Sequence, residues 1–322
     1  MTPGAQPLVT IGLPVYNAAR FLPDTLRSIF AQTLTDWELI AVDDGSTDGG
    51  IDFLRRISDP RVRVLKSDGR RRGLAVRLNQ IAYAARGRYL ARMDADDMMD
   101  PRRLQSQLDF LWAHPDVDVV GCGLYLVDKN TNAVAEVSCP VAHDTIFADP
   151  VRTVGIAHAT VMAQAAWFLA HPYDESNFRC EDWQLFYRTR NESRYSNVTE
   201  PLYFYRLFES FSLRKYCAHK WRMVELWWSL PRAECSQARC LRMTFRSVFD
   251  MALYAAATAT GTYSWLLRRR GKSMQGNPFF ESAIATIRRT VLPGVTTGGA
   301  AKSASQPHGQ GVPEGTSAPE DL

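Results

Sequence analysis

The chain opens with short hydrophobic runs that alternate with segments of helical periodicity. Each run has the length of a buried β-strand. The predicted strands cover residues 8–13, 38–42, 62–65 and 89–93. The predicted helices between them cover residues 21–30, 47–57 and 74–85. This alternation of strands and helices predicts an α/β fold with a mostly parallel sheet.

Polar segments follow three of these strands, in residues 14–17, 43–46 and 94–97. Open sheets of this kind bind ligands beyond the carboxyl ends of their strands, so we expect a site there. No Gly-x-Gly-x-x-Gly follows the first strand, and no Walker-type Gly-x-x-x-x-Gly-Lys-Ser/Thr occurs. A diphosphate bridged by a metal ion is therefore favoured over a dinucleotide bound at a helix N-terminus.

Residues 94–97, Asp-Ala-Asp-Asp, are the strongest candidate for a metal site. Alternate residues at the end of a strand point the same way, so Asp94 and Asp96 should project together. Two such carboxylates suit Mg²⁺ or Mn²⁺, and substrate phosphates commonly complete the coordination. The alternative is that these acids cap the next predicted helix, residues 102–114. Asp100, directly before a proline, is the better candidate for that cap.

Other acidic residues and one histidine have both a chemical and a structural interpretation. Asp43 and Asp44 end the second strand, where a carboxylate can accept from a base or ribose, or close a turn. Glu181 and Asp182 open a predicted helix, where they suit general-base catalysis or stabilisation by the helix dipole. His158 lies in an apolar stretch, where a core histidine is the commoner case. These residues alone leave the alternatives open.

The pattern loosens after residue 114. We predict a long strand over residues 117–127, a mixed apolar stretch over 161–169 and a helix over 181–190. Short strands are predicted near residue 198 and over 202–205. The sequence contains no internal repeat.

The C-terminal third is predicted to be helical and is rich in tryptophan and basic residues. Residues 214–289 contain 14 Lys or Arg and 4 Asp or Glu, which gives +10 against +4 for the whole chain. This charge indicates either a surface for an anionic membrane or a solvated helix face. No apolar stretch reaches the roughly 20 residues of a spanning helix. Residues 296–322 are mostly small or polar, which predicts disorder.

Composition excludes several classes of protein. A chain of 322 residues, 46% hydrophobic and 22% charged, is typical of a globular protein, and its small net charge does not indicate nucleic acid. The six cysteines contain no Cys-x-x-Cys pair, so reduced structural thiols are expected. The six histidines show no zinc-ligand spacing. The N-terminus has no signal-peptide pattern, so we expect a cytoplasmic protein.

Four segments carry a resemblance to a known family. They are VTIGLPVYNAARFLPDTLRSIFAQTLTDWELIAVDDGSTD (9–48), GLAVRLNQIAYAARGRYLARMDADD (73–97), HATVM (158–162) and EDWQLFYR (181–188). They resemble the family 2 glycosyltransferases, which have the GT-A fold. The resemblance covers about residues 8–212 and is specific at the level of the family.

The resemblance implies an inverting hexosyltransferase that uses a nucleotide-diphosphate sugar, with a UDP-sugar expected and dTDP- or GDP-sugars as alternatives. The nucleotide site that it implies comprises Pro14, Val15, Tyr16, Asp43, Asp44, Arg77 and Asp94. Asp96 is implied as the ligand of Mn²⁺ or Mg²⁺, and Asp182 as the catalytic base. His158 and Glu181 are expected on the acceptor side of the site, or in support of its ligands.

One position departs from the family pattern. Many members have a histidine where Phe208 stands, and a phenyl ring can neither ligate a metal nor donate to a phosphate. Either another group substitutes or this loop closes differently. This departure raises one rival function, a non-catalytic nucleotide-sugar-binding protein, although intact Asp96 and Asp182 argue against it. A second, independent rival is a sugar nucleotidyltransferase. A nucleotidyltransferase would need a phosphate-binding loop rich in glycine and basic residues after the first strand, and residues 14–17, Pro-Val-Tyr-Asn, contain neither.

We therefore predict a GT-A domain over residues 1–214, with a nucleotide-binding half at 8–110 and an acceptor half at 111–214. A basic aromatic helical extension covers 215–295, and a disordered tail covers 296–322. The expected acceptor is a glycan or lipid-linked glycan in exopolysaccharide or cell-surface glycan synthesis. Peripheral attachment to the inner face of the cell membrane is expected from the basic extension.

Overall fold

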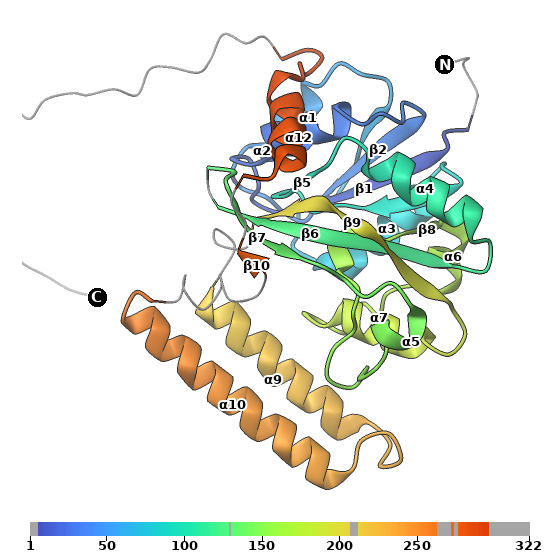
Figure 1. Cartoon of the computed structure of the whole chain (residues 1–322). Helices are drawn as coiled ribbons and strands as arrows, with labels where there is room; N and C mark the ends of the chain where they lie inside the picture. Colours follow the sequence, from blue (N-terminus) through green and yellow to red (C-terminus); the bar gives the residue numbers. More distant parts are fainter. Residues whose placement is uncertain (1–5, 129, 207–211, 263–271, 274–275, 296–322) are drawn as a thin grey trace, which may run out of the picture.

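The fold is described from a computed structural model of the whole chain (Figure 1). The structure describes residues 6–128, 130–206, 212–262, 272–273 and 276–295. Phe208 and the predicted disordered tail, residues 296–322, lie outside the described residues, so both interpretations stay predictions.

Strand–helix units build the N-terminal half, as the hydrophobic pattern predicts. The central strand β1 pairs in parallel with β2 and β4, and β2 pairs in parallel with β3. The elements are β1 (Val9–Val15), α1 (Leu22–Phe30), β2 (Trp37–Asp43), α2 (Gly50–Arg55), β3 (Val62–Leu65), α3 (Leu74–Ala84) and β4 (Tyr89–Arg92).

Helices cover both faces of this sheet, which explains why its strands are continuous hydrophobic runs. Leu39 of β2 belongs to the core that includes α1, whereas Ile40 belongs to the core that includes α3. The helix α2 begins at Gly50, later than predicted, because the Asp48 carboxylate accepts from the N–H groups of Gly50 (3.0 Å) and Ala19 (2.7 Å). Those bonds hold the preceding residues in a loop.

The second half adds antiparallel strands to the same sheet. Strand β8 pairs antiparallel with β4 and β6, and β6 pairs in parallel with β9. The predicted short strands near 198 and 202–205 are one strand, with a register shift opposite Gly123. The elements are β5 (Met98–Met99), α4 (Arg103–Ala113), β6 (Val119–Val127), β7 (Ala133–Val137), α5 (His143–Ile146), η1 (His158–Thr160), β8 (Met162–Gln164), α6 (Ala165–Ala170), α7 (Glu181–Thr189) and β9 (Tyr195–Tyr205).

The C-terminal helices pack on the domain at two separate places (Figure 1). Helices α9 (Leu213–Ser229) and α10 (Gln237–Ala259) lie side by side as a hairpin and share a core with Trp183 of α7. Helix α12 (Pro278–Arg289) packs beside α1 instead, while the short β10 (Lys272–Ser273) pairs with β7. No helix in the described part of the chain is long and apolar enough to span a membrane.

Candidate functional site

A cavity of about 610 Å³ opens at the carboxyl ends of β1, β2 and β4. The loop after β1, the start of α3 and the segment leading into α7 complete its walls. The predicted site residues that line it are Pro14, Val15, Tyr16, Asp44, Arg77, Asp94, Asp96 and Glu181. The described lining does not include Asp43, His158 or Asp182. The polar segments at the strand ends thus meet in one place, as expected from a parallel sheet.

Three carboxylates cluster directly after β4. Asp94, Asp96 and Asp97 each offer one oxygen, and these oxygens lie within 4.8 Å of one another. Asp94 and Asp96 do lie together, but not through strand alternation, because β4 already ends at Arg92. A turn brings them together instead, with the Asp97 N–H donating to the Asp94 carbonyl at 3.4 Å. The turn also brings Asp97 into the cluster, which side-chain alternation along a strand did not predict.

The electrostatics of this cluster fit a divalent cation. Burial, and then the Asp94 charge, raise the pKa of Asp96 to about 6. Burial, and then the Asp96 charge, raise the pKa of Asp97 well above its usual value. The Oδ2 atom of Asp97 is buried and has no hydrogen-bond partner among the described residues. A bound Mg²⁺ or Mn²⁺ would offset the repulsion between these carboxylates, and both ions prefer oxygen ligands.

Two arginines hold the carboxylate turn in position. Arg92, which is 5% exposed, forms an ion pair with Asp94 at 2.8 Å. Arg206 donates from its backbone N–H to Asp97 Oδ1 at 2.8 Å, and from its guanidinium to the Asp96 carbonyl at 2.7 Å. Neither arginine was a candidate in the sequence. Arg206 directly follows β9, so only the pairing of β9 with β5 brings it to this turn.

Asp43 and Asp44 are adjacent in sequence but have different surroundings. The Asp43 carboxylate accepts from the Ser46 N–H at 2.9 Å, which is ordinary turn chemistry. The Asp44 carboxylate faces the cavity and accepts from Arg77 Nε at 2.9 Å and from the Gly73 N–H at 3.1 Å. Because Arg77 is only 1% exposed, its guanidinium acts mainly by holding Asp44 and the loop before α3.

This buried ion pair should carry much of the local stability. We expect Arg77→Met to lower the free energy of unfolding by about 3–5 kcal/mol, because Asp44 would remain as a buried unpaired charge. Arg72→Met is the matched control: Arg72 is 55% exposed and its ion pair with Asp68 is screened by solvent, so we expect no measurable loss of stability. Urea denaturation measures both. Equal losses in the two variants would contradict the assignment.

Tyr16 lies at the mouth of the cavity, with its side chain 41% exposed. The guanidinium of Arg71 lies over the Tyr16 ring, 4.2 Å from the ring centre. A planar aromatic ring and a planar cation at one rim form a surface on which a nucleobase can stack.

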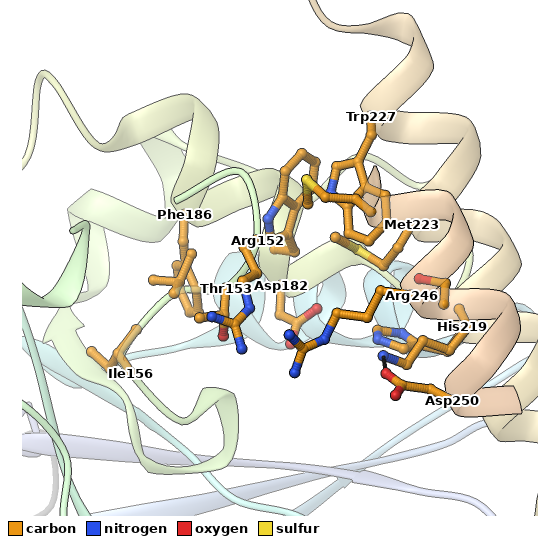
Figure 2. A pocket seen from close by; sticks show the side chains of 15 residues that line it. Arg152, Thr153, Ile156, Asp182, Phe186, His219, Met223, Trp227, Arg246 and Asp250 are labelled. Atoms are coloured by element: carbon orange, nitrogen blue, oxygen red, sulfur yellow. Dashed lines mark hydrogen bonds and ion pairs between the residues drawn. The ribbon is translucent and has the colours of Figure 1, made fainter. Parts of the chain in front are cut away.

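Glu181 and Asp182 begin α7 but line different cavities. Glu181 lines the cavity of the carboxylate cluster and is 8% exposed. Burial, and then the Asp182 charge, raise the pKa of Glu181 to about 7. Asp182 lines a neighbouring cavity of about 440 Å³, between α7 and the α9–α10 hairpin (Figure 2). Successive helical residues point in directions about 100° apart, which separates the two carboxylates.

His158 has the surroundings of a packed core histidine. Its Nε2 lies 2.8 Å from the Tyr173 hydroxyl, and its ring packs edge to face with Phe186. Burial lowers the pKa of His158 well below its usual value, so the ring is neutral near pH 7. It packs between Tyr173 and Phe186, which belong to the core that includes α3.

Known glycosyltransferases resemble this chain in sequence and in fold. EpsE of Bacillus subtilis, a protein assigned to the glycosyltransferases, is 32% identical over 204 residues, which are 61% of this chain and 72% of EpsE. Staphylococcus aureus TarS in complex with UDP-GlcNAc superposes with a TM-score of 0.52 at 14% identity, covering 87% of this chain and 88% of TarS.

A mannosyltransferase from Pyrobaculum calidifontis, solved with GDP-Man and Mn²⁺, gives a TM-score of 0.55 at 19% identity. The match covers 89% of this chain and 86% of the mannosyltransferase. At such identities the two structures establish the GT-A fold and no more. The family model described as "Glycosyl transferase family 2" matches residues 10–216. With that match spanning the sheet and the carboxylate cluster, the chain belongs to glycosyl transferase family 2.

Proposed function

We propose that the protein is an inverting, metal-dependent hexosyltransferase that moves a sugar from a UDP-sugar to an acceptor hydroxyl. The observation that carries this proposal is the single cavity at the strand ends. It is lined by Asp44 and Tyr16 on one side and by the carboxylates of Asp94 and Asp96 on the other. A nucleoside diphosphate has the same polarity, with a planar base at one end and phosphates at the other.

The nucleotide would bind along this cavity. The base and ribose would lie against Pro14, Val15 and Tyr16, with Asp44 accepting from the base. Asp43 would support this contact through its turn, and Arg77 would hold Asp44 in place. The complexes of TarS with UDP-GlcNAc and of the mannosyltransferase with GDP-Man support a nucleotide sugar as donor.

Asp96, helped by Asp94 and Asp97, would hold Mn²⁺ or Mg²⁺. Such an ion neutralises the charge that develops on a departing nucleoside diphosphate. The protein's own part is to fix the turn through Arg92 and Arg206.

We assign Asp182 as the general base. Its carboxylate would take the proton of the acceptor hydroxyl as that oxygen bonds to the anomeric carbon and the bond to the diphosphate oxygen breaks. One displacement inverts the configuration without a covalent enzyme intermediate. Glu181, in the donor cavity, is the rival for this role.

A panel of nucleotide sugars tests the donor assignment. With Mn²⁺ present, a UDP-sugar should raise the melting temperature more than GDP- or dTDP-sugars do. The reason is that a ligand stabilises the native state more, the more tightly it binds. Slow hydrolysis of that donor without acceptor would separate an enzyme from a non-catalytic binding protein. A protein that binds no nucleotide sugar would contradict the proposal.

We further propose that the acceptor is a glycan or lipid-linked glycan in exopolysaccharide or cell-surface glycan synthesis. The helical extension, residues 215–295, would attach the GT-A domain, residues 1–214, to the anionic inner face of the cell membrane. Helix α10 supports this because it exposes five large apolar side chains although its opposite face is already buried. The exposed residues are Leu241, Phe245, Val248, Phe249 and Leu253.

Vesicle sedimentation tests the membrane proposal. We expect binding to anionic vesicles that weakens with salt, because phenylalanine enters the interface while the basic residues of this segment attract acidic headgroups. The double variant Phe245→Ser, Phe249→Ser should bind at least about tenfold more weakly. Tyr83→Ser, at an equally exposed aromatic on α3, should bind normally. Equal binding to neutral vesicles, or none to either, would contradict the proposal.

A further inference from the structure

The cavity beside Asp182 adjoins the donor cavity at the start of α7, where Asp182 lines one and Glu181 the other, and it is built mainly by the α9–α10 hairpin. Figure 2 shows it between α7 and the two long helices, with a volume of about 440 Å³. Asp182 lies at its α7 edge, Met223 and Trp227 come from α9, and Arg246 comes from α10. The only catalytic function proposed so far for a residue of this cavity is that of Asp182 as the base.

Two tryptophans give this cavity rigid walls. The indole N–H of Trp183 donates to the Pro150 carbonyl at 2.9 Å, and that of Trp227 donates to the Val151 carbonyl at 2.6 Å. Both rings are buried and held at their polar edge, and the Trp183 ring stacks on Tyr187 with 4.8 Å between ring centres, so the two tryptophans fix the shape of the cavity but offer it little open ring face. Fixed aromatic walls with a few polar groups are typical of small-molecule sites.

The cavity is lined by three Lys or Arg side chains and two carboxylates. Lys220 forms an ion pair with Asp250 at 3.0 Å, so that charge is balanced within the protein. The side chains of Arg152 and Arg246 form no hydrogen bond or ion pair with any other described residue. In Figure 2 both guanidinium groups and the Asp182 carboxylate border the same open space. Two guanidinium groups converging on one space favour a ligand with oxyanion geometry.

We propose that this cavity binds the acceptor and selects acceptors that carry an anionic group, either a phosphate or a carboxylate. Arg152 and Arg246 bind that group, the buried tryptophans keep the cavity in shape, and the reacting hydroxyl lies at the α7 edge, between Asp182 and the donor cavity. The inference rests on the proposed function, because Asp182 is the base only in a glycosyltransferase that uses this side for its acceptor.

Calorimetry with small sugar probes tests the site, with UDP and Mn²⁺ at saturation so that the donor cavity is filled. We expect methyl β-glucuronide or glucose 6-phosphate to bind at least about tenfold more tightly than methyl β-glucoside. Arg152→Gln and Arg246→Gln should each weaken binding of the anionic probe about 10- to 100-fold. The tighter of the two anionic probes identifies carboxylate or phosphate as the natural group.

Arg242→Gln is the matched control, because Arg242 is exposed on the same helix one turn before Arg246 and does not line the cavity. It should bind every probe as the unmodified protein does. Equal binding of the neutral glucoside, or unchanged binding in both arginine variants, would overturn the proposal. UDP affinity is the independent readout: its absence in the unmodified protein would contradict the proposed function, whereas intact UDP binding without anion selectivity would contradict only this site.

Discussion

Asp96→Ala should abolish sugar transfer and remove the dependence of UDP affinity on Mn²⁺. The variant loses the side chain at the centre of the carboxylate cluster, which lies beside the position proposed for the donor diphosphate. Charge neutralisation by a metal contributes several kcal/mol to such a step, so the rate should fall by about 10³-fold or more. Transfer rate, together with UDP calorimetry in Mn²⁺ and in EDTA, measures both effects.

The same variant should keep its stability, which separates a metal role from a structural one. Burial and the Asp94 charge already hold the pKa of Asp96 high, so removing this carboxylate relieves repulsion in the folded state. Its melting temperature without metal should match or exceed that of the unmodified protein. Asp52→Ala, at a carboxylate that is 77% exposed on α2, serves as the control and should transfer normally. Full activity of the unmodified protein in EDTA would contradict the metal assignment.

Asp182→Asn should lower the transfer rate by about 10²- to 10⁴-fold, the usual contribution of a general base. The amide keeps the shape of the side chain but cannot accept the proton. Donor affinity should change little, because Asp182 lines the neighbouring cavity and not the one that holds the nucleotide. Glu181→Gln should be milder, since charge at a helix start contributes only about 0.3–1 kcal/mol. Donor calorimetry and transfer rates are measured side by side for both variants.

The pH profile distinguishes the two carboxylates further. Glu181 titrates with a pKa of about 7, so it is ionised above that pH and protonated below it. If Glu181 were the base, the rate would fall as pH drops through about 7, and Glu181→Gln would be inactive. We expect instead that Glu181→Gln stays active across this range. An inactive Glu181→Gln beside a normal Asp182→Asn would show that the base is Glu181.

The hydrophobic periodicity of the sequence predicted the first half of the fold, because this periodicity reflects the local secondary structure. A strand buried on both faces must be hydrophobic throughout, and β1 and β2 are. The site followed from the same pattern, because parallel strands bring their carboxyl ends to one edge whatever their detailed packing. Asp94 and Asp44 were therefore identifiable as candidates before any coordinates.

Contacts between distant segments were not predictable in this way. Arg206 supports the carboxylate turn only because β9 returns beside β5, and its guanidinium also reaches Asp24 of α1 at 3.2 Å. That pairing brings together residues as far apart in the chain as Asp97 and Arg206, 109 positions, and no local pattern encodes which distant strands become neighbours. The separate packing of α12 beside α1 was missed for the same reason.

The sequence by itself thus determined the parallel sheet, the edge at which the site lies and the acidic residues there, because hydrophobic period and strand direction act locally. Only the tertiary structure decided how neighbouring residues divide their roles. Asp43 closes a turn while Asp44 faces the cavity, and Glu181 and Asp182 line different cavities. The two residues of each pair are chemically alike, so the sequence does not distinguish their roles. Which one faces a cavity depends on the side from which the rest of the chain packs against them.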